Sequence, residues 1–286
     1  MAFNWQIFKT RSLTAIVFVI VMLAGLLWNR WSFFILFSIV HAGAWLEYQK
    51  LISGFYPGYA RISSFHKITV LLAGWCIMLF FTNDELHIGN IHLQETGLWL
   101  GAVLIVLLPA GDLIKGDFLI PNMAYSITGL LYISLPLGLL VDLRNRWDEG
   151  LYQLSVTVPL LIIFSLWIND TMAYIVGSLI GKTPLSVISP KKTWEGTIGG
   201  IILTIIAISL IAYLTHRLSI THAALMASIA AISGTFGDLT ESKLKRMAGV
   251  KDSGQIMPGH GGFLDRFDSL LFASVFVWFY AVIFIG

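Results

Sequence analysis

Two groups of carboxylates frame residues 238–269, a polar segment between two strongly apolar stretches near the C-terminus. If the preceding helix continues to about Met247, polar side chains at i, i+3, i+4 and i+7 share one face. These side chains are Asp238, Glu241, Ser242 and Lys245. At the start of the last apolar helix, the same spacing recurs at Asp265, Asp268 and Ser269. Carboxylates on two helix ends that face one loop can share a hard divalent cation.

The loop between these helix ends carries little side-chain bulk. Residues 258–262 read Pro-Gly-His-Gly-Gly, so their backbone N–H groups can approach an anion closely. Taken singly, basic residues beside a membrane helix commonly set topology, and glycines commonly end helices. Together with the carboxylates, the loop and its basic neighbours suit a polyphosphate bound with Mg²⁺. These neighbours are Lys243, Lys245, Arg246, Lys251 and Arg266.

A second polar location lies within the apolar stretch 157–180. Asn169 and Asp170 fall about midway along it, where a polar pair should face protein or a water-filled cavity. Tyr174 shares their face one turn on, and glycines at the next two i+4 steps allow another backbone to pack closely. Helix packing around a buried hydrogen bond accounts for this pattern equally well. The two glycines are Gly177 and Gly181.

A basic turn follows this stretch. Lys191, Lys192 and Thr193 precede a helix that we expect to begin near Gly196. Basic side chains and a helix N-terminus therefore converge at a point where a phosphate could bind.

The composition is that of an integral membrane protein. Of 286 residues, 57% are hydrophobic and 12% charged, and the mean hydropathy is +0.80, outside the usual range of soluble domains. The net charge of +2 offers a nucleic acid no electrostatic attraction, so no nucleic-acid partner is expected. The single cysteine, Cys76, excludes an intramolecular disulfide.

Hydropathy predicts an all-α polytopic membrane protein with about nine transmembrane helices, since a bilayer core takes roughly 20 apolar residues as helix. The expected spans are 12–28, 31–48, 67–83, 95–111, 121–141, 157–180, 197–215, 221–240 and 266–285.

Basic residues predict the orientation of these helices. With the N-terminus cytoplasmic, only four of the 18 Lys and Arg residues fall outside, as the positive-inside rule requires. The four are Arg30, Arg144, Arg146 and Arg217. The loops at 182–196 and 241–265 then share the cytoplasmic side, so we expect a polar cavity opening there. The short N-terminus, without an evident transit peptide, favours a bacterial inner membrane.

The chemistry-bearing residues begin near Leu151, where we place a functional boundary. Residues 1–150 are interpreted as a scaffold and lipid-facing wall, and residues 151–286 as the catalytic region. Glu47 lies near the end of an N-terminal span, where it could simply reach the membrane interface.

The polar segments of the C-terminal half closely resemble the signature of the phosphatidate cytidylyltransferases. One match reads Ser242-x2-Lys245-Arg246-x4-Lys251-Asp252-x5-Pro258-Gly259-His260-Gly261-Gly262-x2-Asp265-Arg266-x-Asp268-Ser269. The other reads Asn169-Asp170-x2-Ala173-Tyr174-x2-Gly177-x3-Gly181-Lys182, followed by Ser189-Pro190-Lys191-Lys192-Thr193-x-Glu195-Gly196. The N-terminal half is similar only in being several hydrophobic spans.

This resemblance implies that CTP and phosphatidate react to give CDP-diacylglycerol and pyrophosphate. It also implies a Mg²⁺ cofactor, held by Asp238, Asp265 and Asp268. Lys191, Lys192 and Lys245 would neutralise the triphosphate. The remaining expected substrate-binding residues are Asn169, Asp170, Tyr174, Ser242, Arg246, Lys251, His260, Gly261, Gly262 and Arg266. The resemblance suggests a homodimer and leaves open whether a monovalent cation such as K⁺ joins the Mg²⁺.

Two other functions share some of these features. An ion-coupled transporter also places Asp residues and glycine-interrupted helices within the membrane. However, the charges gather on one side and the sequence has no internal repeat. The other alternative is a different CTP-dependent lipid enzyme, acting on an isoprenoid-ether lipid or as a lipid kinase, although the C-terminal signature favours the diacyl lipid.

Overall fold

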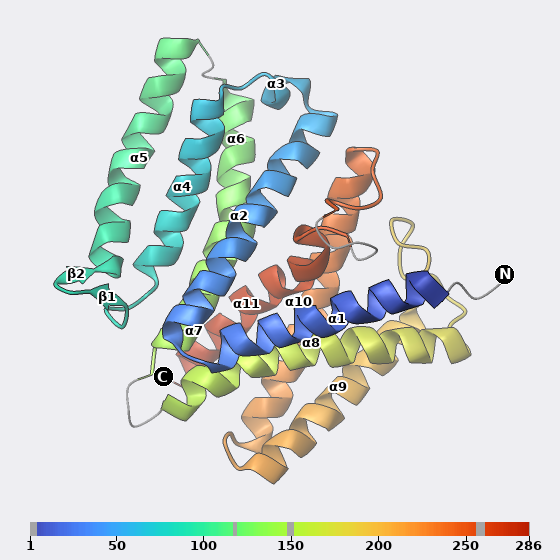
Figure 1. The fold of residues 1–286 in the computed structure, drawn as a ribbon. Helices are drawn as coiled ribbons and strands as arrows, with labels where there is room; N and C mark the ends of the chain where they lie inside the picture. The colour runs from blue at the N-terminus through green and yellow to red at the C-terminus, as the bar shows by residue number, and fades with distance from the viewer. Residues whose placement is uncertain (1–4, 117–118, 148–151, 256–260, 286) are drawn as a thin grey trace.

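The computed structural model describes residues 5–116, 119–147, 152–255 and 261–285, without the side chains of residues 5–12 and 152. Within these ranges the chain is almost entirely helical (Figure 1). The helices are α1 (Trp5–Leu27), α2 (Arg30–Phe55), α3 (Pro57–Ala60), α4 (Ser64–Phe80), α5 (Leu93–Lys115), α6 (Ile120–Gly129), the π-helix η1 (Leu130–Ser134), α7 (Leu135–Asn145), α8 (Tyr152–Ile180), α9 (Trp194–Thr215), α10 (Ile220–Met247) and α11 (Leu264–Phe284). A short antiparallel pair, β1 (His87–Ile88) and β2 (Ile91–His92), joins α4 to α5.

Each apolar segment expected from hydropathy coincides with helix in the described part of the chain, with α6, η1 and α7 together forming the fifth. Six helical segments in these ranges are long and apolar enough to cross a membrane. They are Leu93–Lys115, Ile120–Asn145, Gln153–Ile180, Trp194–Thr215, Ile220–Met247 and Leu264–Phe284. The chain is therefore an all-α polytopic membrane protein. Nine crossings, a cytoplasmic N-terminus and the functional boundary near residue 150 stay predictions.

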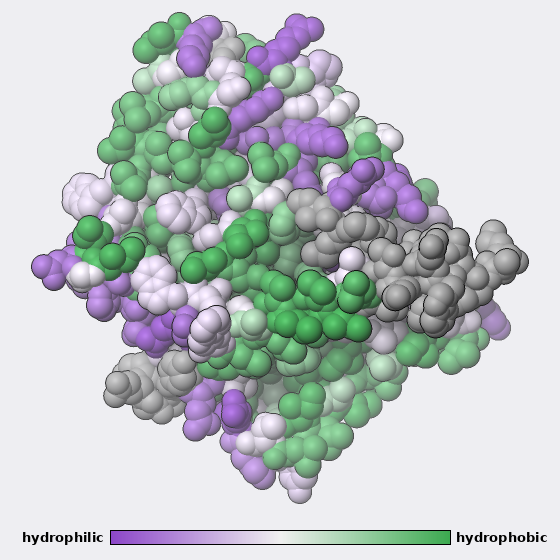
Figure 2. Space-filling model, viewed as in Figure 1, coloured by the Kyte–Doolittle hydropathy of each residue, from purple (hydrophilic) through white to green (hydrophobic). Residues whose placement is uncertain are grey.

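Helices that follow one another in sequence pack as neighbours, most extensively α4 with α5, α8 with α9 and α10 with α11, and also α9 with α10. Helix α11 also packs against α7, and α1 runs along α8 while contacting α2 (Figure 1). Apolar side chains cover much of the face formed by α1 (Figure 2), and half or more of the side chain is exposed at Ile16 and Ile20. Exposed apolar surface of this kind is suited to lipid.

Four of the long helices begin with a local side-chain cap. Asn29 and Ser32 form a capping box at the start of α2, with Ser32 N donating to Asn29 Oδ1 over 2.8 Å. Ser63, Thr193 and Ser219 cap α4, α9 and α10 in the same way. Helix α11 differs, because its N-cap residue is Phe263, which has no side-chain acceptor. The first N–H groups of α11 therefore need an acceptor from elsewhere in the fold.

Glycines allow the close helix contacts that bring the polar residues together. A Cβ on Gly196 would lie 2.7 Å from the carbonyl oxygen of Ala173, so α9 approaches the α8 backbone directly. On α8, Gly177 faces this contact, as expected from the spacing of small residues. Between α10 and α11, a Cβ on Gly237 would lie 2.5 Å from the carbonyl oxygen of Asp268. This contact places Asp238 beside Asp268.

Gly237→Ala is therefore expected to destabilise the protein, because the new methyl group meets backbone that cannot rotate away. Overpacking of this kind costs about 1–3 kcal/mol, and it should lower the melting temperature of the detergent-solubilised protein. Gly101→Ala is a matched control in another helix, since its Cβ would lie 3.4 Å from Cys76 Cβ, an ordinary contact. That variant should gain up to about 1 kcal/mol from helix propensity. Equal melting temperatures for the two variants would contradict the close α10–α11 contact.

Candidate functional site

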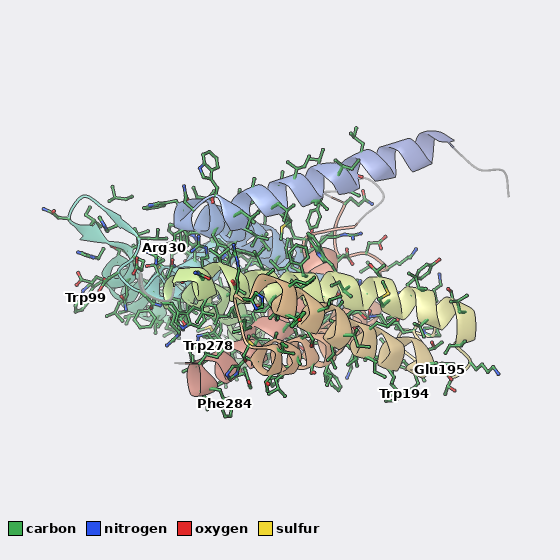
Figure 3. All side chains as sticks on the ribbon, turned by 90° about the horizontal axis from the view of Figure 1, so that it is seen from below. Arg30, Trp99, Trp194, Glu195, Trp278 and Phe284 are labelled. Atoms are coloured by element: carbon green, nitrogen blue, oxygen red, sulfur yellow. The ribbon has the colours of Figure 1, made fainter. Side chains whose placement is uncertain are left out.

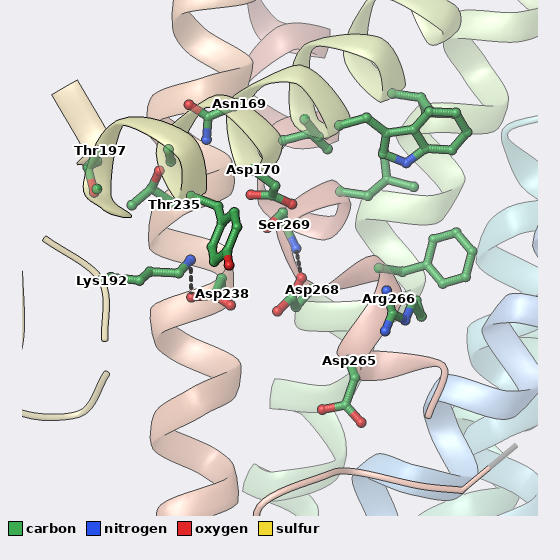
Figure 4. Close-up of a pocket in the computed structure, with 18 of the residues that line it drawn as sticks. Asn169, Asp170, Lys192, Thr197, Thr235, Asp238, Asp265, Arg266, Asp268 and Ser269 are labelled. Atoms are coloured by element: carbon green, nitrogen blue, oxygen red, sulfur yellow. Dashed lines mark hydrogen bonds and ion pairs between the residues drawn. The ribbon is translucent and has the colours of Figure 1, made fainter. Parts of the chain in front are cut away.

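A cavity of about 470 Å³ lies between α1, α8, α10, α11 and the turn that precedes α9 (Figure 4). Its polar lining comes from elements far apart in the sequence. Polar and charged side chains on this wall are Asn169, Asp170, Tyr174, Ser178, Lys191, Lys192, Thr193, Thr197, Thr235, Asp238, Asp265, Arg266, Asp268 and Ser269. The structure thus gathers most of the residues that the sequence singled out into one site.

Carboxylates from three helices meet in this cavity: Asp170 from α8, Asp238 from α10 and Asp268 from α11 (Figure 4). Asp268 is 8% exposed, and its Oδ1 accepts a hydrogen bond from Ser269 N at 2.5 Å. Asp238 pairs with the ammonium group of Lys192 at 2.5 Å. The cavity therefore concentrates negative charge and matches it with basic side chains at one edge.

Asp265 also borders the cavity, but its oxygens accept hydrogen bonds from Lys245 and from the loop that precedes α11. Asp265 Oδ1 accepts a hydrogen bond from Lys245 Nζ at 2.6 Å. Its Oδ2 accepts from Gly262 N and from Ser253 N, each at 2.8 Å. In the part of the chain that the structure describes, no three His, Cys, Asp or Glu side chains form a cluster suited to a metal ion. The expected ligand set of Asp238, Asp265 and Asp268 stays a prediction.

Lys245 is held away from the cavity. Besides Asp265 it contacts Glu241, one turn back on α10, and Glu241 is fully buried. The helical spacing expected up to Met247 is confirmed by this i, i+4 pair. However, Lys245 is outside the cavity lining, and its expected contact with a triphosphate stays a prediction.

Several other expected substrate-binding residues lie beyond the cavity wall. Ser242, Arg246 and Lys251 are outside the lining, and Arg246 Nη1 donates to the carbonyl of Val250 at 3.3 Å. Gly261 and Gly262 contact Asp265 and do not line the cavity. Gly262 N donates to Asp265 Oδ2, and Gly261 has a φ of +84°. His260 lies outside the described residues. The roles expected for these residues stay predictions.

The basic turn between α8 and α9 is built by backbone and side-chain bonds. Leu185 N donates to the carbonyl of Lys192 at 2.7 Å, and Trp194 N to that of Thr183 at 2.9 Å. Glu195, in the first turn of α9, accepts from the backbone N–H groups of Lys182 and Thr183 and from the Thr183 hydroxyl. These bonds fix the turn that carries Lys191 and Lys192. Figure 3 places Trp194 and Glu195 at the opposite end of the molecule from Arg30, Trp278 and Phe284.

One side of the cavity is apolar. Phe18 and Met22 of α1, Trp167 of α8 and Phe267 of α11 contribute to it. The Phe18 ring lies 6.5 Å from that of Trp167 and 6.1 Å from that of Phe267, measured between centroids. The site therefore joins a charged compartment to an apolar wall that includes helix α1, which also carries exposed apolar side chains.

Sequence reasoning missed the contribution of α2 and of Ser253. The sequence allows Glu47 of α2 to reach the membrane interface, yet in the structure it is 6% exposed and contacts the loop that precedes α11. The sequence did contain a signal for Glu47, because an ionisable residue within a membrane helix is usually retained for a structural or functional role. The contacts of Phe18 and Trp167 had no signal, since each is one of many aromatic residues in apolar helices.

Residues 9–284 match the sequence model of the cytidylyltransferase family. A phosphatidate cytidylyltransferase of Staphylococcus haemolyticus is 35% identical over 266 residues, which cover 92% of this chain and 95% of that protein. One of Bacillus subtilis is 32% identical over 279 residues, covering 96% of this chain and 98% of that protein. A phosphatidate cytidylyltransferase of Synechocystis is 41% identical over 154 residues, covering 52% of this chain and 53% of that protein.

Glu195→Ala is expected to loosen the basic turn, because it removes the acceptor of the Lys182 and Thr183 N–H groups. Losing hydrogen bonds to a charged acceptor should speed hydrogen exchange at these two amides about tenfold or more. Mass spectrometry of peptides covering residues 181–185 measures this change. The matched control is Glu95→Ala, which removes the first-turn glutamate of α5. Unchanged exchange at Lys182 and Thr183 would show that Glu195 does not hold the turn.

Proposed function

The chain belongs to the cytidylyltransferase family, and from that premise we propose that it transfers a cytidylyl group from CTP to phosphatidate. The products are CDP-diacylglycerol and pyrophosphate. Relatives named for this activity align over nearly the whole chain, which supports the proposal. The observation that carries it at the level of the site is the junction of carboxylates from three helices, lysines and an apolar wall in one cavity. Neither a transporter nor an enzyme of another lipid acceptor has comparable support.

In the proposed reaction, a phosphate oxygen of phosphatidate attacks the α-phosphorus of CTP. Pyrophosphate leaves in line as the new P–O bond forms. The nucleophile is already anionic, so catalysis consists mostly of positioning and charge neutralisation. Lys191 and Lys192 are placed to neutralise the triphosphate and the departing pyrophosphate, since both line the cavity from the turn before α9.

The carboxylates that line the cavity fit a magnesium ion. Mg²⁺ is usually held by one or two protein carboxylates together with substrate phosphates and waters. Asp238 and Asp268, from adjacent helices, supply two such oxygen donors, and Asp170 adds negative charge opposite them. Bound there, Mg²⁺ would neutralise phosphate charge during transfer. Asp265 borders the same cavity and keeps the loop near these donors through Ser253 and Gly262.

The shape of the site suits two substrates of different polarity. The phosphate head of phosphatidate would enter the charged compartment while its acyl chains remain beside Phe18, Met22 and Trp167. CTP would arrive at the basic turn, on the side we propose to be cytoplasmic. The opposite end carries Arg30, which pairs with Glu85 and donates to the carbonyl of Trp147. Its place far from the basic turn is consistent with the orientation inferred from the positive-inside rule.

The proposal extends to the cell membrane and to assembly. The relatives of similar length are bacterial, which supports a bacterial membrane protein, and we place it in the inner membrane. A homodimer and a monovalent cation such as K⁺ remain predictions of the family resemblance.

Conversion of radiolabelled CTP to a chloroform-soluble product by the purified protein tests the function. Product should require phosphatidate and Mg²⁺, each omitted in turn. Asp268→Asn should lower the rate at least about a hundredfold, as expected when a preorganised charge is removed. Asp84→Asn, at an exposed position near β1, is the matched control and should retain activity. Full activity of Asp268→Asn would refute the role of this carboxylate, and product without phosphatidate would refute the acceptor.

Lys191→Ala tests the basic turn separately. Removing its charge should raise the KM for CTP about tenfold, since hydrogen bonds to charged groups contribute about 1.5–3 kcal/mol. Lys182→Ala, in the same turn, is the control, because the Lys182 side chain lies outside the cavity lining. Initial rates over a range of CTP concentrations measure both variants. The assignment fails if Lys191→Ala leaves the KM for CTP unchanged.

A further inference from the structure

Glu47 is a buried carboxylate in the half of the chain interpreted as a scaffold. It lies on α2, and both of its oxygens accept hydrogen bonds from residues more than 200 positions away. Oε1 accepts from Phe263 N at 2.9 Å, and Oε2 accepts from Leu264 N at 2.8 Å. Ser253 Oγ donates to Oε2, also at 2.8 Å. A single side chain therefore joins α2 to two separate segments of the catalytic region.

These bonds supply the cap that α11 lacks locally. The Phe263 and Leu264 N–H groups belong to the first turn, where backbone donors have no partner within the helix. A carboxylate at this position also interacts favourably with the positive end of the helix dipole. Glu47 thus does for α11 what Asn29, Ser63 and Ser219 do for their own helices. The difference is that its contact fixes α11 against another helix.

The same contact is linked to the cavity through Ser253. The Ser253 hydroxyl lies 2.8 Å from both Glu47 Oε2 and Asp265 Oδ2. Ser253 N donates to Asp265 Oδ2, and the first turn of α11 carries Asp265 itself. Asp268 follows one turn later and points into the cavity (Figure 4). Any shift of Glu47 would therefore move the helix start from which both aspartates project.

Glycines surround the Glu47 carboxylate. A Cβ on Gly254 or on Gly262 would lie 2.2 Å from Glu47 Oε1, closer than any non-bonded approach allows. The backbone on both sides of the contact must therefore be bare for the carboxylate to fit. We call the hydrogen bonds from Glu47 to Ser253, Phe263 and Leu264 the Glu47 clamp.

We propose that Glu47 is a positioning residue for cytidylyl transfer. It holds residues 253–254 and 262–264 against α2 and so sets the placement of Asp265 and Asp268. Glu47 itself lies outside the cavity lining, so it acts through these residues and not on the substrates. The inference rests on the proposed function for its catalytic consequence, but the clamp can be measured without turnover.

Glu47→Gln is the sharpest test, because it keeps the shape of the side chain. An amide has one acceptor oxygen, so its NH₂ group would face a backbone N–H or the Ser253 hydroxyl. The expected result is a fall in kcat of about ten- to a hundredfold, since small displacements of catalytic groups have effects of this size. The KM values for CTP and phosphatidate should stay within about twofold, because no substrate contact is removed. Hydrogen exchange at the Phe263 and Leu264 amides should become faster.

Asp112→Asn is the matched control for a general loss of stability. Asp112 is also a buried carboxylate of the N-terminal half, but its partner is His66, at 2.6 Å, and not a residue of the loop that precedes α11. This variant should lower the melting temperature while leaving kcat per folded protein and exchange at residues 263–264 unchanged. If Glu47→Gln yields no folded protein, Ser253→Ala tests the same link. It should reduce kcat in the same direction, by about threefold to tenfold.

The possible outcomes distinguish failure of the Glu47 clamp from failure of the proposed function. Unchanged exchange at Phe263 and Leu264 in Glu47→Gln would overturn the clamp, whatever the activity. Faster exchange with a wild-type kcat would overturn the positioning role. An equal fall of kcat in Asp112→Asn at a similar melting temperature would assign the effect to stability alone. Wild-type protein that makes no product from CTP and phosphatidate would instead refute the proposed function.

Discussion

A carboxylate inside an apolar helical bundle is costly unless it receives hydrogen bonds or an opposite charge. This constraint organises the protein, because its buried and half-buried acids are partnered at each level of the bundle. Glu47 receives two backbone N–H groups, Asp265 pairs with Lys245, and Asp238 pairs with Lys192. At the other end, Asp142 accepts from Asn83 and Trp278, joining the loop after α4 to α11. These partnerships tie helices together at the same time as they stabilise charge.

Two carboxylates of the cavity, Asp170 and Asp268, differ from these partnered acids. Asp170 and Asp268 have few protein donors compared with Asp265, and they face a space large enough for a phosphate group. Charges left in this way become available to a cation and a polyanion. The well-bonded acids, by contrast, serve to hold helix ends in position. In the proposed chemistry Asp268 would act together with Asp238, which pairs with Lys192 at the edge of the cavity.

Close helix packing brings these carboxylates together. Gly196 and Gly237 have no side chain, so α9 packs directly on α8 and α11 packs directly on α10. Carboxylates from three helices can therefore reach one cavity. Because these contacts involve backbone, the relative positions of the helices are tightly set. Helix α1 packs less deeply and presents apolar surface beside the cavity, where a lipid could approach from the membrane. Rigid walls on one side and a lipid-facing wall on the other suit a reaction between a soluble nucleotide and a membrane lipid.

Local properties of the chain were predictable from the sequence. Runs of apolar residues located the helices. The shared face expected for Glu241 and Lys245, if the helix continued to about Met247, is confirmed in α10. Both features depend on neighbours along one helix. The signature residues likewise identified the basic turn before α9 and the helix ends that form much of the cavity. Tertiary structure alone decided that Glu47 caps α11, that Asp265 serves the loop, and that Phe18 and Trp167 border the cavity. These contacts join residues up to about two hundred positions apart, and they depend on how helices pack, which no local pattern encodes.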